Sequence, residues 1–274
     1  MSAARLVEIE RGAHLEVTGA PGTAAVMAAH PADALAAPAV ELLEHASGAR
    51  VVCINPRGVG ASSPAPRRQS IEEMVDDLEA ARLRAGIGPV LFWGMSGGGW
   101  LALAYAHRHP HALRGLVLES SDACFRARLA DERCLLSPFH PPWRAPLEAH
   151  HLLGPGSHDD PRAGDVEWVE IAGAGSVWRR RGGPALLVAP FPVDARLRAV
   201  MPALWEFDAR PWTAEVRVRA LVMCGTADPV VPIHHARALA TALRTDLVEI
   251  EGAGHVPVAQ RHPAVAAAVR AFRQ

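Results

Sequence analysis

Trp93-Gly94-Met95-Ser96-Gly97-Gly98 is the stretch that decides how the rest of this sequence is interpreted. It follows a short apolar run over 90–93, which predicts a buried strand, and it precedes an apolar segment over 99–109, which predicts a helix ended by Pro110. A serine with glycines two positions before and after it, at a strand-to-helix turn, can be held in a strained conformation with its hydroxyl exposed. The helix that follows points its free N–H groups and partial positive charge at the same place, which suits a developing oxyanion.

Outward from this turn, short apolar runs alternate with segments of helical periodicity, which favours an α/β sheet. An antiparallel hairpin is expected over 6–9 and 14–18, and further strands over 24–29, 51–54, 116–118, 220–224 and 247–250. Helices are expected over 34–45, 71–85, 234–243 and 264–272, with Ser70 as the N-cap of the second. These elements predict a mostly parallel eight-stranded sheet flanked by helices.

The alternation is interrupted between the strand over 116–118 and the strand over 220–224. Pro, Arg, His and Trp are frequent there, and no regular strand–helix pattern is evident. The sequence therefore predicts a core formed by 1–123 and 211–274 and a mainly helical inserted cap over 124–210. The tryptophans of this insertion, including Trp178, could pack a core or could form an apolar lid over a substrate.

Composition excludes several classes of chemistry. The chain has 274 residues, a net charge of −1 and no lysine, so every one of its 28 basic residues is arginine. A Schiff-base lysine, a P-loop lysine and a Ser–Lys dyad are therefore ruled out. The lack of a basic face argues against nucleic-acid or membrane-surface partners, and no histidine grouping has convincing metal-ligand spacing.

The sequence also predicts the cellular location of the protein and the state of its thiols. The sequence shows neither a signal peptide nor an apolar run long enough to span a membrane, so a cytoplasmic location is expected. Cys53 and Cys224 lie in predicted core strands, which favours buried free thiols. The expected oligomeric state is a monomer or a homodimer.

A serine hydroxyl needs a base to remove its proton and an acid to orient that base. His255, in a glycine-flanked loop after the last predicted strand, is the candidate base. Asp228 follows the strand over 220–224 and is the candidate acid, which gives the chain order Ser, Asp, His. Glu119 or Asp122, after an earlier strand, could supply the acid instead.

Four motifs now resemble the α/β-hydrolase superfamily, and in particular its proline iminopeptidases, ester and lactone hydrolases and carbon–carbon bond hydrolases. Besides the turn at Ser96, they are Asn55-Pro56-Arg57-Gly58-Val59-Gly60-Ala61-Ser62, Gly225-Thr226-Ala227-Asp228-Pro229-Val230-Val231-Pro232 and Gly252-Ala253-Gly254-His255. The resemblance implies an α/β-hydrolase fold and a Ser96–His255–Asp228 triad that needs no cofactor. Iminopeptidases usually carry Trp after the nucleophile, whereas Gly97 stands there in this chain, which argues against peptidase activity.

The resemblance also implies where an oxyanion would be bound. The family usually carries His-Gly after the third strand, whereas this chain has His30-Pro31, and proline has no N–H to donate. The backbone donors are therefore expected from Ala32 and Gly97, and Asp33 is expected to point away or to bind a polar group. Substrate contacts are expected from four side chains: His30, Met95, Trp178 and Val256.

The function expected from these residues is hydrolysis of an ester, lactone or related acyl bond of a small, partly apolar molecule through an acyl-enzyme on Ser96. The same triad could instead serve acyl transfer, cyclisation, amide cleavage or carbon–carbon cleavage. A third possibility is a ligand-binding protein of this fold with little or no turnover.

Overall fold

The computed structural model describes two compact units of the chain. It describes residues 4–65, 69–137, 140–141, 166–171, 175–180, 185–189, 195–260 and 262–274. The first unit comprises Met1–Ala123 and Ala209–Gln274, and the second comprises Cys124–Asp208. Within the described residues, no helix is long and apolar enough to cross a lipid bilayer.

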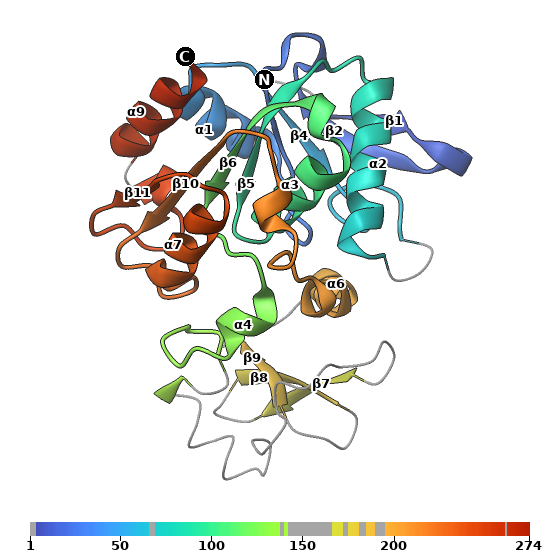
Figure 1. Ribbon diagram of the computed structural model, residues 1–274. Helices are drawn as coiled ribbons and strands as arrows, with labels where there is room; N and C mark the ends of the chain where they lie inside the picture. The colour runs from blue at the N-terminus through green and yellow to red at the C-terminus, as the bar shows by residue number, and fades with distance from the viewer. Residues whose placement is uncertain are drawn as a thin grey trace. The chain divides into compact units, whose positions relative to one another are not determined.

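An eight-stranded sheet forms the centre of the first unit (Figure 1). Its strands are β1 (Ala4–Glu8), β2 (His14–Gly19), β3 (Val26–Ala28), β4 (Val51–Asn55), β5 (Val90–Met95), β6 (Leu113–Glu119), β10 (Ala220–Gly225) and β11 (Leu247–Ile250). The spatial order is β1-β2-β4-β3-β5-β6-β10-β11. Only β1 and β2 pair in antiparallel fashion with their neighbours, and the strands from β4 to β11 are parallel. The predicted eight-stranded, mostly parallel sheet is confirmed.

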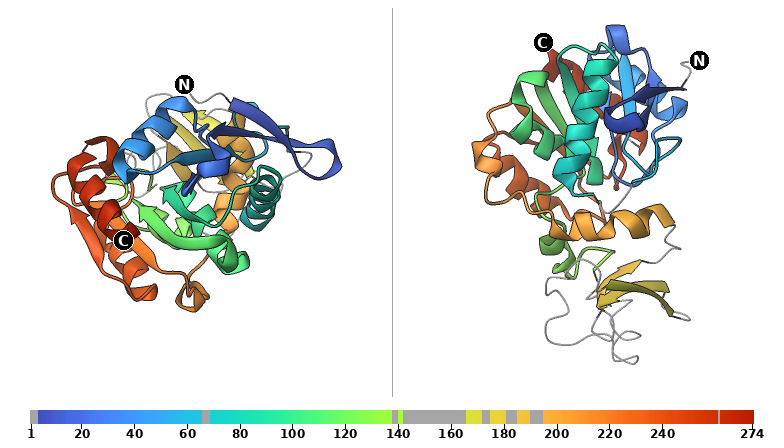
Figure 2. Two further views of the ribbon diagram at one scale, coloured as in Figure 1. Left: turned by 90° about the horizontal axis from the view of Figure 1, so that it is seen from above. Right: turned by 90° about the vertical axis from the view of Figure 1, so that its right-hand side faces the viewer.

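Helices cover both faces of this sheet. They are α1 (Ala37–Ser47), α2 (Ile71–Arg84), α3 (Gly97–Arg108), α7 (Ile233–Ala242), α8 (Pro257–Gln260) and α9 (His262–Arg273), with 3₁₀ turns at Glu10–Gly12, Pro21–Thr23, Pro110–Ala112 and Thr213–Glu215. Helices α1 and α9 pack together on one face, and α2 and α3 pack together on the other (Figure 2).

Local sequence sets the helix boundaries. The side chain of Ser70 accepts from the N–H of Glu73 while the Glu73 carboxylate accepts from the N–H of Ser70, so α2 begins with a capping box. Helix α1 begins at Ala37, later than predicted, because Pro38 is suited to the first helical turn. Helix α3 begins directly after Ser96, two residues earlier than predicted.

Apolar side chains from the sheet, α1 and α9 form one buried cluster. Val51 and Cys53 of β4 and Met223 of β10 contribute from the sheet, and Val40 of α1 and Val269 of α9 pack onto them. Burying each such side chain stabilises the fold by roughly 1.5–3 kcal/mol relative to exposure. The loops at the carboxyl ends of the strands therefore extend from a well-packed core.

The second unit contains strands that the sequence analysis did not predict. Its described elements are α4 (Phe125–Leu129), β7 (Val166–Ile171), β8 (Gly175–Arg180), β9 (Ala185–Ala189) and α6 (Ala195–Glu206), and the three strands form an antiparallel sheet. The expectation of a mainly helical insertion is therefore not met in its described part. Each of these strands is short, so the β-branched and aromatic residues of Val166–Ile171 give only a weak periodic signal.

Candidate active site

Ser96 lies at the sharp turn between β5 and α3. Its φ is 50° and its ψ is −121°, an uncommon backbone conformation for a residue with a side chain. The glycines around it are needed because the segments are close: a Cβ on Gly98 would lie 2.5 Å from the carbonyl oxygen of Ala29, and one on Gly94 would meet the backbone of Gly98. The strained turn is held by the N–H of Ser96, which donates to the carbonyl oxygen of Glu119 at 2.9 Å.

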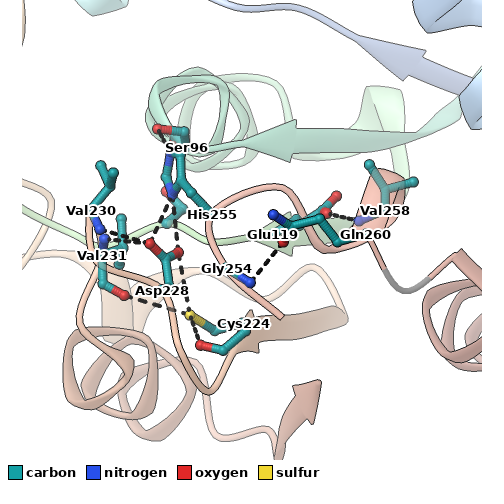
Figure 3. Close-up of polar contacts among 12 residues, drawn as sticks. Ser96, Glu119, Cys224, Asp228, Val230, Val231, Gly254, His255, Val258 and Gln260 are labelled. Atoms are coloured by element: carbon teal, nitrogen blue, oxygen red, sulfur yellow. Dashed lines mark hydrogen bonds and ion pairs between the residues drawn. The ribbon is translucent and has the colours of Figure 1, made fainter. Parts of the chain in front are cut away.

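Ser96, His255 and Asp228 form one hydrogen-bonded chain (Figure 3). The Nε2 atom of His255 lies 3.0 Å from Ser96 Oγ, and its Nδ1 atom lies 3.0 and 3.1 Å from the two carboxylate oxygens of Asp228. A carboxylate can only accept, so the imidazole proton is assigned to Nδ1. Nε2 is then left to accept from the serine hydroxyl.

The environment of Asp228 keeps its carboxyl group ionised. Its side chain is fully buried, and one oxygen accepts from the N–H groups of Val230 at 2.8 Å and Val231 at 2.9 Å. Burial alone would raise the pKa of this carboxyl, but the hydrogen bond and charge of His255 and the two N–H donors outweigh burial and lower it. A buried anion is thereby directed at the imidazole.

The other two carboxyl groups that could have served as the acid do not reach His255. Glu119 accepts from the N–H of Val258 at 2.7 Å and from the indole N–H of Trp93 at 2.8 Å. Asp122 accepts from the indole N–H of Trp100 at 3.3 Å. Of the three sequence candidates, Asp228 is the one that the structure brings to the imidazole.

Two segments flank the nucleophile on the side expected to bind an oxyanion. Gly97 is the first residue of α3, where helical N–H groups have no partner within the helix. The N–H of Ala32 donates to His30 Nδ1 at 3.3 Å, and the N–H of Asp33 donates to the same atom at 2.9 Å. The Asp33 side chain is 77% exposed, with Oδ2 3.0 Å from His30 Nδ1, so it lies at the surface.

His30 borders the nucleophile turn. A Cβ on Gly97 would lie 3.2 Å from His30 Nε2 and 3.1 Å from Pro31 Cγ. Burial lowers the pKa of His30; the carboxylate of Asp33 opposes this change and the nearby His255 adds to it. An uncharged imidazole therefore adjoins Gly97.

The remaining sequence candidates fall into two groups. Met95 and Val256 are the half-buried chain neighbours of Ser96 and His255. Trp178 lies in β8 of the second unit, and its side chain lies outside the part of the structure that is described. Sequence reasoning missed the backbone support of the site, such as the hydroxyl of Ser121, which donates to the carbonyl oxygen of Ser96 at 2.8 Å. The sequence signal that could have indicated this contact is the position of Ser121 just after the end of β6, the strand next to β5.

Asn55 is the first residue of the Asn55–Ser62 motif, and its contacts are structural. Its side-chain oxygen accepts from the N–H of Leu35 at 2.9 Å, and its nitrogen donates to Glu16 at 2.9 Å. Asn55 therefore ties the segment after His30 to the sheet.

Comparisons with known proteins agree with this architecture. A family model described as alpha/beta hydrolase fold matches residues 21–143, and one described as serine hydrolase matches residues 166–274. The chain belongs to the α/β-hydrolase superfamily, which confirms the resemblance that its motifs carry.

Individual relatives are similar over parts of their length. A proline iminopeptidase of Neisseria gonorrhoeae is 40% identical over 77 residues, which cover 27% of this chain and 25% of that protein. A pimeloyl-[acyl-carrier protein] methyl ester esterase of Aromatoleum aromaticum is 30% identical over 171 residues, which cover 60% of this chain and 66% of that protein. The match thus spans about a quarter of the iminopeptidase.

The similarity in fold extends over the whole length of a solved structure. An alpha/beta fold family hydrolase from Bacillus anthracis superposes with a TM-score of 0.70 at 16% identity and covers 99% of both chains. At this identity the similarity concerns the fold alone.

Proposed function

We propose that this protein is a serine hydrolase that cleaves an ester, lactone or related acyl bond of a small, partly apolar molecule. The observation that carries the proposal is the unbroken hydrogen-bonded chain from Ser96 Oγ through His255 to Asp228. A serine hydroxyl becomes an effective nucleophile in this arrangement because the base is both within reach and oriented.

Each residue has a defined step in the proposed reaction. His255 Nε2 takes the proton of Ser96 as Oγ attacks the carbonyl carbon, and Asp228 stabilises the imidazolium that forms. The imidazolium then returns this proton to the leaving group, which produces an acyl-enzyme on Ser96. Water, deprotonated by His255, hydrolyses the acyl-enzyme and restores the free hydroxyl. None of these reaction steps requires a cofactor or a metal.

We assign oxyanion binding to the backbone N–H groups of Gly97 and Ala32. The helix N-terminus at Gly97 supplies a donor beside the nucleophile. The Ala32 N–H lies 3.3 Å from His30 Nδ1, a long hydrogen bond that it would exchange for the oxyanion.

The residue after the nucleophile argues against peptidase activity. Proline iminopeptidases usually carry a tryptophan there, whereas at Gly97 even a Cβ would crowd His30 and Pro31, so a tryptophan would not fit without movement of that segment. The methyl ester esterase similar to this chain supports an ester substrate instead. We further propose that the second unit, inserted between β6 and β10, acts as a cap that selects the substrate.

The hydrogen bond from the Ala32 N–H to His30 Nδ1 favours a second candidate function, that of a ligand-binding protein. As long as this N–H stays bound to His30, it cannot stabilise an oxyanion, and the protein would bind its ligand with little turnover. Such a ligand would raise the unfolding temperature without being consumed.

The test is labelling with a fluorophosphonate probe, followed by mass-spectrometric mapping of the modified peptide. The wild type is expected to label at Ser96, whereas Ser96→Ala and His255→Ala should not label. His111→Ala is the matched control, because this exposed histidine precedes the start of β6, at the other end of the sheet. A folded wild type that labels elsewhere, or a Ser96→Ala variant that retains esterase activity, would contradict the proposal.

A further inference from the structure

Glu119 is a fully buried carboxyl group near the candidate triad, and the proposed reaction does not use it. It is the last residue of β6, it is 0% exposed, and in the sheet it pairs with Met95, the residue before the nucleophile. Each of its carboxylate oxygens accepts one N–H: Oε1 from Val258 at 2.7 Å, and Oε2 from the Trp93 indole at 2.8 Å.

These contacts connect the two segments that carry the nucleophile and the base. The backbone oxygen of Glu119 accepts from the N–H of Ser96 at 2.9 Å. Its side chain binds the N–H of Val258, three residues after His255 (Figure 3). The Trp93 indole comes from β5, the strand that leads to Ser96. One residue thus links the turn at Ser96 to the loop that carries His255.

We propose that Glu119 is a positioning residue that holds His255 within reach of Ser96, and that it does so in its ionised form. This inference rests on the proposed serine hydrolase function. Both groups that bind the carboxylate are donors, so both bonds form only when both oxygens can accept. A proton on either oxygen would face an N–H, and one of the two links would be lost.

The surroundings of Glu119 make its ionisation sensitive to pH. Burial raises the pKa of its carboxyl group to about 7; the N–H groups of Val258 and Trp93 oppose this increase, and the negative charge of Asp228 adds to it. The Cys224 thiol, 3.8 Å from Asp228, is the other titratable group that faces Glu119 among the described residues. Burial keeps that thiol neutral by raising its pKa to about 12. Protonation of Glu119 is therefore expected near neutral pH.

The experiment measures the rate of fluorophosphonate labelling at Ser96 between pH 5 and 9 for the wild type and three variants. Wild-type labelling should fall at low pH, because protonation of Glu119 breaks one of its two N–H bonds. Glu119→Gln cannot ionise and cannot accept both N–H groups, so labelling should be about 10–100-fold slower at high pH, and it should depend less steeply on pH than in the wild type.

Trp93→Phe provides an independent variant that leaves the carboxyl group in place. It removes the N–H that stabilises the ionised form, so the acidic midpoint should move upward by about one pH unit. Trp100→Phe is the matched control, because it removes an indole N–H from Asp122, a buried carboxyl group outside this link. Its midpoint should equal that of the wild type.

The outcomes separate this inference from the proposed function. Failure of the folded wild type to label at Ser96 would overturn the proposed function, and this inference with it. Labelling of Glu119→Gln at the wild-type rate and with the wild-type pH dependence would overturn the positioning role alone. If Glu119→Gln fails to fold, an unchanged midpoint in Trp93→Phe would overturn it equally.

Discussion

His30 packs closely against Gly97: a Cβ on Gly97 would lie 3.2 Å from Nε2 of the imidazole. The same Cβ would lie 3.1 Å from Pro31 Cγ. Separations of 3.0–3.4 Å are tighter than nine in ten real Cβ contacts, so a side chain at Gly97 requires the segment after β3 to move by a few tenths of an ångström. That segment carries the N–H of Ala32, which we assign to the oxyanion.

Gly97→Ala is therefore expected to lower activity by displacing this segment. The φ of Gly97 is not in the left-handed region, so the effect comes from crowding and not from backbone strain. We expect a kcat for ester hydrolysis about 10-fold lower, because a displaced oxyanion donor stabilises the transition state less well. The free energy of unfolding should fall by roughly 1–3 kcal/mol, a typical cost of overpacking. Steady-state kinetics and urea unfolding measure the two effects.

Two further variants assign this effect to the neighbouring histidine. Gly88→Ala is the matched control, since a Cβ there would meet nothing within 4 Å, and it should leave kcat unchanged. His30→Ala opens space at Gly97, so the loss caused by Gly97→Ala should be smaller in the His30→Ala background. Strict additivity of the two substitutions would contradict the steric explanation.

Much of the fold could be predicted from the sequence because its signals are local. The apolar runs that became β5 and β10, and the helical spacing with Ser70 as cap in α2, need no knowledge of distant residues. The strands of the second unit were missed because each is short, and their pairing is set by neighbouring strands and not by any one segment.

The candidate site shows the same division. Ser96 and His255 lie in recognisable local motifs, and Asp228 follows from the chain order of the fold. Setting Glu119 aside as an alternative acid required the folded chain, because Glu119 finds its partner Val258 139 residues away. The bond between the Ala32 N–H and His30 likewise depends on how one turn folds back on itself.

Glu119 should make the stability of this protein depend on pH. Its folded-state pKa of about 7 lies above the ordinary 4.5, so the native state binds this proton more tightly than the unfolded state. The stabilisation is therefore fully present below about pH 4.5, and it is lost as pH rises through about 7. Glu119→Gln does not ionise, so between pH 4.5 and 8 its free energy of unfolding should rise relative to the wild type by on the order of 3 kcal/mol.

Urea unfolding of both proteins across this pH range measures the difference, in which the contributions of the other carboxyl groups cancel. Glu249→Gln is the matched surface substitution, because Glu249 is exposed and its ion pair with Arg237 is screened by solvent. It should shift the unfolding curve by only a small amount. A Glu119→Gln difference that does not change with pH would show that burial does not perturb Glu119.

The loop that carries His255 is fixed from a second side by Gln260, whose Oε1 accepts from the N–H of Gly254 at 2.7 Å. Gln260 is exposed and lies in α8, so its side chain can be changed without opening a cavity in the core. Gln260→Ala removes the acceptor, and a net hydrogen-bond contribution of about 1 kcal/mol corresponds to roughly fivefold slower fluorophosphonate labelling if the bond orders His255. Gln260→Glu keeps an oxygen at the same place, so it should label at nearly the wild-type rate. If the two variants label equally fast, the bond between Gln260 and Gly254 does not help to place the base, and the Glu119 contact to Val258 is left as the stronger constraint on this loop.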